Sequence, residues 1–301
     1  MKTLLCLTLA AACRLAAANV DLAVVQTQLD HQDYRAAEPA LQPLLAASSP
    51  SEAERELIYQ WLFAHDDSAE VDRRSKRGTT STDALAAGRL ALDQHDFSRA
   101  EALDREALQR ADTPLRRARA LRALGQLSYQ QRRFDASLEQ LNLSLALVRT
   151  PDALEALNET LIRVGRTDEA IAAAEEAVKL NPYHELAHYQ LGNGYSRRNY
   201  TQMAAQDGPK LEVALARVRE ASDAFERGQF DVARDACFAA LALVPDLGRA
   251  HAILARTLEA QRFVVDVHRA DYERRFDAAP MPQIPGIERF VLNWKELSPR
   301  H

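Results

Sequence analysis

The sequence predicts an all-α protein in which antiparallel helical hairpins stack side by side as a solenoid. The strong helix formers Ala, Leu, Arg, Glu and Gln are abundant in the 301 residues, whereas aromatic residues make up 6% and there are only 10 glycines. A short pattern, an aromatic residue followed three positions later by a small one, also recurs along the chain. Because one hairpin leaves an apolar face open, such units are stable when neighbours stack on them.

The recurring pattern sets the length of the repeating unit. It occurs at Phe97 with Ala100, Phe134 with Ser137, Thr167 with Ala170 (Thr replacing the aromatic residue) and Phe230 with Ala233. The steps are 37 residues from Phe97 to Phe134 and 33 residues from Phe134 to Thr167. A period of about 34 residues accommodates two helices and their turns. The small residue lets paired helices approach closely, and the aromatic ring fills the wedge between them.

At residue level the units resemble tetratricopeptide repeats. Glycines lie nine residues before the aromatic position or two before it, and prolines end units: Gly88, Gly125, Gly165, Gly228, Pro182 and Pro245. The stretch "RALGQLSYQQRRFDASLEQLNLSLALV" shows the pattern well. The resemblance covers about residues 82 to 279, with a weaker copy around Tyr34 and Ala37. It implies a tetratricopeptide-like α-solenoid whose first helices line a groove.

The expected organisation has five parts. Residues 1–18 are a signal peptide, 19–67 an N-terminal helical segment with a divergent repeat, 68–81 a polar linker, 82–279 the solenoid and 280–301 a Pro-rich extended tail. The sequence Asp207-Gly208-Pro209 is expected to shorten or kink a helix and so to interrupt the groove.

The N-terminus indicates export to the periplasm or envelope. Lys2 precedes the apolar stretch 4–12, and the small residues 16–18 provide a cleavage site. A lipid anchor at Cys13 is a second interpretation, which the sequence favours less. No other stretch is apolar enough over the roughly 20 residues that a membrane-spanning helix needs.

Charge argues against a nucleic-acid partner. Without residues 1–18, which contain Lys2 and Arg14, 36 basic residues face 43 acidic ones. The basic cluster Arg73, Arg74, Lys76 and Arg77 has no interleaved aromatic residues, so it is interpreted as a solvated loop. A protein or peptide is therefore the expected partner.

One motif suggests chemistry. His184-Glu185-Leu186-Ala187-His188 is a literal H-E-x-x-H, which on a helix places two imidazoles where they can share a zinc ion. The repeat frame argues for another interpretation, with His184 at a helix start and His188 packed against the paired helix. Cys237 is likewise interpreted as a packed core residue. The sequence thus predicts no metal and no cofactor.

The expected binding residues lie on the first helices of the hairpins, because by resemblance these helices line the groove. They are Arg89, Arg119, Arg122, Gln126, Tyr129, Glu155, Glu159, Tyr189, Asn193 and Arg197. Arg and Tyr are frequent anchors of protein interfaces. The leading hypothesis is an extracytoplasmic scaffold that binds a protein or peptide, and the sequence favours a chain without catalytic activity of its own over an enzyme. The alternative is the helical part of an exported, metallopeptidase-like enzyme whose catalytic domain lies beyond residue 301.

Overall fold

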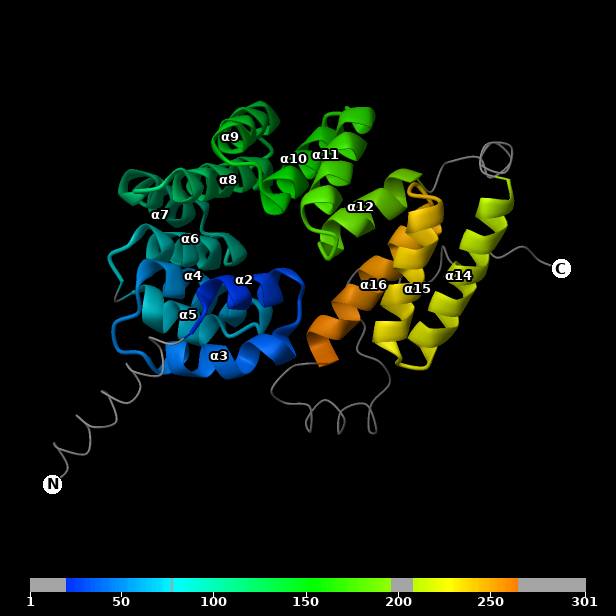
Figure 1. Cartoon of the computed structure of the whole chain (residues 1–301). Coiled ribbons are helices and arrows are strands. Elements are labelled where there is room, and N and C mark those ends of the chain that lie inside the picture. Colours follow the sequence, from blue (N-terminus) through cyan, green and yellow to red (C-terminus); the bar gives the residue numbers. More distant parts are fainter. Residues whose placement is uncertain (1–19, 77, 196–207, 265–301) are drawn as a thin grey trace, which may run out of the picture. The chain divides into compact units, whose positions relative to one another are not determined.

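The computed structural model describes residues 20–76, 78–195 and 208–264 (Figure 1). The chain divides into two compact units after Phe263, and the features below belong to the first. The described residues form helices and turns and contain no strand. The expected signal peptide at 1–18, the end of the expected solenoid at 265–279 and the expected tail at 280–301 lie outside the described residues.

Consecutive helices pair as hairpins. The pairs are α2 (Leu22–Asp30) with α3 (Tyr34–Ala46), α4 (Glu52–Ala64) with α5 (Ser68–Ser75), α6 (Ser81–Asp93) with α7 (Phe97–Arg110), α8 (Pro114–Gln130) with α9 (Phe134–Leu147), α10 (Pro151–Arg163) with α11 (Thr167–Leu180), and α14 (Pro209–Glu226) with α15 (Phe230–Leu243). Helices α12 (Glu185–Tyr195) and α16 (Gly248–Val264) follow α11 and α15. The first member of each pair, together with α12 and α16, is called a first helix below.

The recurring pattern marks the beginning of the second helices. Phe97, Phe134, Thr167 and Phe230 are the first residues of α7, α9, α11 and α15. The small residue three positions later is fully buried in each case: Ala100, Ser137, Ala170 and Ala233. The all-α hairpin solenoid that the sequence predicts is therefore confirmed.

Each hairpin turn uses the same backbone geometry. The residue two positions before the second helix has a left-handed backbone at Gln32, Asp66, His95, Arg132, Gly165 and Gly228. The next residue donates its N–H to the carbonyl five residues earlier, as Arg133 does to Ser128 at 2.8 Å and Arg166 to Leu161 at 2.9 Å. This is the hydrogen bond of a Schellman motif, which satisfies a carbonyl at the end of the first helix.

Side-chain caps fix where several first helices begin. Thr113 and Thr150 accept backbone N–H groups at the starts of α8 and α10, and each is followed by a proline at the first helical position. Proline suits that position because its missing N–H would have no partner inside the helix. Helix α4 begins with a capping box formed by Ser51 and Glu54. Sequence-local chemistry therefore sets the register in which the first helices stack.

The structure differs from the prediction at the expected linker. Residues 68–75 form helix α5, and residue 81 already belongs to α6, so most of the expected linker is helical. Val71 is the apolar residue that α5 buries. Ion pairs support the rest of the helix, with Arg74 2.6 Å from Glu70 and Lys76 2.5 Å from Asp72. A helix with so few buried apolar positions leaves no periodic signal in the sequence.

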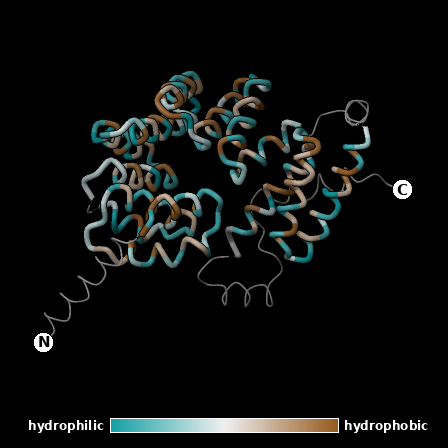
Figure 2. The backbone as a smooth tube through the Cα atoms, in the orientation of Figure 1, coloured by the Kyte–Doolittle hydropathy of each residue, from teal (hydrophilic) through white to brown (hydrophobic). Residues whose placement is uncertain are grey.

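The core lies between the helices. In Figure 2, hydrophobic and hydrophilic segments alternate along the helices, as expected where one side of each helix packs on a neighbour. Small residues allow close approach. A Cβ atom on Gly125 would lie 2.8 Å from Leu141, and one on Gly192 would lie 3.1 Å from the backbone of Ala252 in α16. No described helix is long and apolar enough to span a membrane.

Gly208 has a positive φ of 45° and precedes Pro209, the first residue of the long helix α14. The sequence predicts that a helix is shortened or kinked just before this point, and residues 196–207 lie outside the described residues.

One contact joins residues far apart in the sequence. The ring of His31, which follows α2, stacks on Tyr183, which precedes α12, with 4.3 Å between centroids. Beside it, the Asn181 side chain donates to the backbone oxygen of Asp30 at 2.9 Å. The turn of the first hairpin thus contacts the segment between α11 and α12.

Candidate binding face

Polar residues follow one side of α8 at helical spacing. Arg119, Arg122, Gln126 and Tyr129 are separated by three, four and three positions, which places them on one face of the helix. The neighbouring first helix α10 presents Asp152 and Glu155, and His184 lies just before α12. These seven residues are called the first-helix face.

At one end of this face, arginines are held by ion pairs. Arg119 lies 2.6 Å from Glu56 on α4, and Arg116 lies 2.8 Å from the same carboxylate. The Glu56 side chain is only 15% exposed, so the two guanidinium groups neutralise a largely buried charge. Arg119 therefore has a structural role in addition to its position on the face.

In the middle of the face, Arg122 is less constrained. It donates to Gln126 at 3.2 Å on its own helix. Its charge also acts on the carboxyl groups of Asp152 and Glu155, which belong to the next first helix. Nearby, Tyr129 accepts a hydrogen bond from Arg163 of α10 at 3.1 Å. The faces of α8 and α10 are therefore electrostatically continuous.

An acidic pair and a histidine meet beside Arg122. His184 Nε2 lies 3.3 Å from Asp152 Oδ1 and 3.5 Å from Glu155 Oε2. Burial raises the pKa of Glu155 to about 7, and the carboxylate of Asp152 adds to this effect. The pKa of His184 is also raised, because its hydrogen bond to Asp152 and the charge of Glu155 outweigh the opposing effect of burial.

These three side chains could in principle hold a metal ion, since their ligand atoms all lie within 4.8 Å of one another. The hydrogen bonds of His184 favour a proton instead. Its Nδ1 accepts the N–H of Ala187 at 3.3 Å, so the neutral ring carries its proton on Nε2, directed at Asp152. A metal at Nε2 would move that proton to Nδ1, where it would face the N–H of Ala187.

The two histidines of the H-E-x-x-H sequence point to different surroundings. His188 is 1% exposed, and its Nδ1 lies 2.8 Å from Nδ1 of His251 on α16. The Nε2 atoms of His188 and His251 contact the carbonyls of Pro182 and Pro245 at 2.7 and 2.8 Å. Burial lowers the pKa of His188 to about 3 and that of His251 to about 4. His184 and His188 therefore do not share a ligand position.

The other residues expected to bind are more dispersed. Arg89 is exposed, and its guanidinium lies over the ring of Phe63 at 4.0 Å. Glu159, Tyr189 and Asn193 are exposed on α10 and α12, and Arg197 lies outside the described residues. The structure adds Asp152 and His184 to the site. Their position at helix starts, rather than on a periodic face, explains why the sequence pattern does not select them.

Cys237 lies in the core of the α14/α15 hairpin and is fully buried. Burial raises the pKa of its thiol to about 12, so the reactive thiolate is strongly disfavoured. This agrees with the interpretation of Cys237 as a packed residue.

The chain is an all-α repeat protein of the solenoid class. Its hairpins stack through close contacts at small residues, and its first helices present a polar face. Residues 85–153, from α6 into α10, match the family model of the tetratricopeptide repeat. No curated protein matches the sequence significantly.

Solved structures resemble the chain at low sequence identity. The hetero-tetramer Cut9-Hcn1 of the APC/C matches 83% of this chain and 54% of its own with 14% identity and a TM-score of 0.52, which supports the fold alone. YrrB, a tetratricopeptide protein with an unusual peptide-binding site, covers 61% of this chain and 95% of its own at 17% identity and a TM-score of 0.34. The match to the C-terminal part of a tetratricopeptide repeat protein from Cytophaga hutchinsonii covers 75% of this chain and 96% of that one, at 15% identity and a TM-score of 0.35.

Proposed function

We propose that the protein is a binding scaffold whose first-helix face holds a segment of another protein or a peptide. One observation carries the proposal: His184, just before α12, lies 3.5 Å from Glu155 of α10, and the charge of Arg122 of α8 acts on the same carboxyl group. Repeat proteins use surfaces of this kind, built from equivalent helices, to bind extended partners.

The charges of the face favour a partner that carries both signs. Among the residues that the structure describes, the hydrogen-bond partner of Arg122 is Gln126, which is uncharged, so an acidic side chain of the ligand would gain a charge-assisted hydrogen bond there. Glu155 is largely buried and has a raised pKa, so a ligand lysine or arginine would stabilise its ionised form. An acidic and a basic residue a few positions apart are the expected recognition pattern.

Selection of peptides from a displayed random library on the purified chain tests this proposal. The selected peptides should contain the paired charges and should lose affinity by about tenfold or more when Arg122 is replaced by Glu, because a charge-assisted contact becomes a repulsion. Arg119 is unsuitable for this test, since its replacement would leave Glu56 without one of its two partners.

Arg105→Glu is the matched control. Arg105 is an exposed arginine on the second helix α7, paired only with Glu101, so the variant makes the same charge change away from the first-helix face. Equal affinity of the selected peptides for wild type and Arg122→Glu would show that binding does not use this face.

We further propose that the scaffold acts outside the cytoplasm, supported by the signal-like sequence of residues 1–18. Fusion of residues 1–30 to a reporter enzyme that is active only after export should give activity. Loss of membrane association in a Cys13→Ala variant would indicate lipidation, whereas unchanged fractionation would indicate simple cleavage.

A catalytic role of the H-E-x-x-H sequence is not part of this proposal, because His188 is buried against His251 and directed away from His184. The alternative of a peptidase-like domain beyond residue 301 stays a prediction, which the gene sequence downstream of His301 tests.

A further inference from the structure

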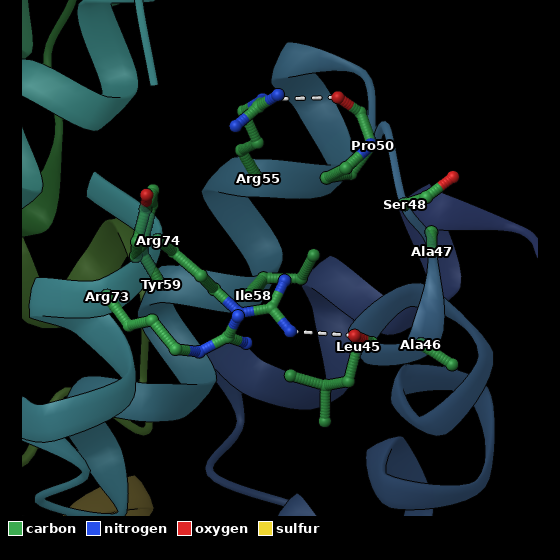
Figure 3. Close-up of a pocket in the computed structure, with 10 residues that line it drawn as sticks. All are labelled: Leu45, Ala46, Ala47, Ser48, Pro50, Arg55, Ile58, Tyr59, Arg73 and Arg74. Atoms are coloured by element: carbon green, nitrogen blue, oxygen red, sulfur yellow. Dashed lines mark hydrogen bonds between the residues drawn. The ribbon is translucent and has the colours of Figure 1, made fainter. Parts of the chain in front are cut away.

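A pocket of about 430 Å³ lies in the second hairpin, and it shares no residue with the first-helix face. It is enclosed by the segment between α3 and α4, by α4 and by α5. Figure 3 shows Arg55 at one end of the pocket and Arg73 and Arg74 at the other. The volume is in the range typical of small-molecule sites. The ten lining residues include three arginines and no carboxylate: Leu45, Ala46, Ala47, Ser48, Pro50, Arg55, Ile58, Tyr59, Arg73 and Arg74.

Two of the guanidinium groups are fixed in place by backbone carbonyls. Arg55 Nε donates to the oxygen of Pro50 at 3.1 Å, and Arg74 Nη2 donates to the oxygen of Leu45 at 2.7 Å (Figure 3). These contacts join α4 to Pro50, just before the helix, and α5 to the last turn of α3. Because the carbonyl oxygens of Leu45 and Pro50 already accept these hydrogen bonds, most of the hydrogen-bonding groups still available in the pocket are N–H donors of the arginines.

The arginines also contact acidic residues that do not line the pocket. Arg55 Nη1 lies 3.2 Å from Asp83 on α6, which also accepts the hydroxyl of Tyr59 at 2.6 Å. Arg74 Nε donates to Glu70 at 2.6 Å, and Arg73 contacts the same carboxylate. Each guanidinium has five N–H donors, so Nη2 of Arg55 and Nη1 of Arg74 are left over from these contacts.

The charged groups in and around the pocket have an excess of one positive charge. Arg55, Arg73 and Arg74 bring three positive charges, against the two negative charges of Glu70 and Asp83. The side chains of Arg55 and Arg74 are only 24% and 16% exposed, so solvent screens this excess incompletely. A single negative charge on a ligand would neutralise the pocket.

Most of the remaining wall is apolar. Leu45 and Ala46 at the end of α3, and Ala47 and Pro50 in the segment that follows, line one side together with Ser48, and Ile58 lines the α4 side. An inorganic anion would leave this wall unused. A molecule with one carboxylate and a short apolar chain would satisfy the guanidinium donors and the apolar wall together.

We propose that this pocket binds an organic monocarboxylate, with the carboxylate at the end where Arg73 and Arg74 lie and the apolar portion along Ile58 toward Pro50. Such a carboxylate occurs on a free small acid or at the C-terminus of a peptide. The proposal does not depend on the function of the first-helix face.

Titration of the full chain with hexanoate, followed by calorimetry or by amide shifts in nuclear magnetic resonance, tests the proposal. One saturable site is expected, whereas hexylamine, which has the same chain and the opposite charge, should not bind. Inorganic phosphate, which has the charge without the apolar chain, should bind about tenfold more weakly than hexanoate. Phosphate binding as tight as that of hexanoate would contradict the assignment of a carboxylate with an apolar group.

Two variants probe the pocket independently. Arg74→Met removes a donor fork, and Ala47→Trp adds bulk at a half-buried lining residue without replacing an arginine. Each should weaken hexanoate by about tenfold or more, since each removes one half of the recognition. If Arg74→Met does not fold, as judged by circular dichroism, Ala47→Trp decides the result. Arg105→Met is the control and should bind as wild type does. Wild-type affinity in Ala47→Trp would overturn the proposal.

A dipeptide with a free carboxyl terminus, compared with its C-terminal amide, distinguishes the two sources of the carboxylate. Tighter binding of the free-acid dipeptide than of hexanoate, lost on amidation, would support the site and assign it to a peptide terminus. Binding of hexanoate without binding of the dipeptide would support a free small acid. Absence of binding of both would contradict the site.

Discussion

Individual polar residues interrupt an interior that is otherwise rich in alanine and leucine, and Asp104 is the clearest case. It occupies in the α6/α7 hairpin the place that Leu141 has in α8/α9: a Cβ atom on Gly88 would meet Asp104, and one on Gly125 would meet Leu141. Asp104 is 2% exposed, and its Oδ1 has no hydrogen-bond partner among the described residues. Burial raises its pKa to about 7.

Replacing Asp104 by Asn tests the energetic consequence. The folded protein retains a proton on Asp104 up to about pH 7, whereas the unfolded chain releases it near pH 4. The free energy of unfolding of the wild type should therefore fall as pH rises from about 4 to 7, by on the order of 3 kcal/mol from this residue. Asp104→Asn keeps the shape and should lose that part of the decline in urea titrations at several pH values.

Glu101→Gln on the same helix is the control, because Glu101 lies at the surface in an ion pair with Arg105. It should retain the wild-type dependence on pH. An Asp104→Asn variant whose stability declines with pH as steeply as that of the wild type would show that Asp104 is ionised in the folded protein.

At the candidate site, sequence could predict the residues of a helix face but not their partners. The spacing of Arg119, Arg122 and Tyr129 follows from the helical period, and the structure places them on one side of α8 as expected. The ion pair of Arg119 with Glu56 joins residues 63 positions apart, so no local pattern reveals it. His184 and His188 also have different surroundings because His188 contacts His251, and these two residues meet only where α12 packs against α16.

At the scale of elements, the hairpin turn is the most repeated feature, and its backbone is conserved in geometry more than in sequence. Gly165 and Gly228 are expected at the left-handed position, and they have φ values of 80° and 69°. The same position is taken by Gln32, Asp66, His95 and Arg132 in other hairpins. Residues with a Cβ atom are strained there, by roughly 1–2 kcal/mol. The second helix and the Schellman hydrogen bond hold the turn against this strain.

Exchanging residue types at two equivalent turns tests this balance. Arg132→Gly should raise the free energy of unfolding by up to about 1 kcal/mol, since relief of strain exceeds the entropy that glycine gains in the unfolded chain. Gly165→Ala should lower the free energy of unfolding by about 1 kcal/mol. No atom lies within 4 Å of the new methyl group, so the cost comes from the strained backbone alone. Urea unfolding measures both. A change of the same sign in the two variants would contradict a common left-handed turn.

The elements that sequence could predict are those with a strong apolar period. The second helices α7, α9, α11 and α15 begin where the recurring pattern places them, because the buried small residue is a direct requirement of close helix packing. Helix α5 was expected as a linker, and its sequence explains the difference. It buries one apolar side chain, Val71, and relies on ion pairs and on Arg74 contacting Leu45, neither of which leaves a periodic signal.

At the scale of the molecule, stacked repeats are usually coupled only to their neighbours, so stability is close to a sum of units and the interfaces between them. Here the contact of His31 and Asp30 with Tyr183 and Asn181 adds a link between the first hairpin and the segment before α12. The ring stack and the hydrogen bond together are worth about 1–2 kcal/mol. Among the described residues the first hairpin begins the array, and the end of a repeat array is the part most prone to fray.

This link predicts an effect that nearest-neighbour coupling does not produce. Asn181→Ala together with Tyr183→Ala should speed amide hydrogen exchange in α2 by up to about tenfold, the factor that corresponds to roughly 1.4 kcal/mol, although the substitutions lie about 150 residues away. Exchange in α8, which lies between them in the sequence, should be unchanged. His95→Ala is the matched control, because His95 occupies an equivalent hairpin turn and contacts only its neighbour Phe97 among ring partners. Unaltered exchange in α2 would mean that the repeats are coupled only in chain order, and that α2 depends for its stability on α3 and α4 alone.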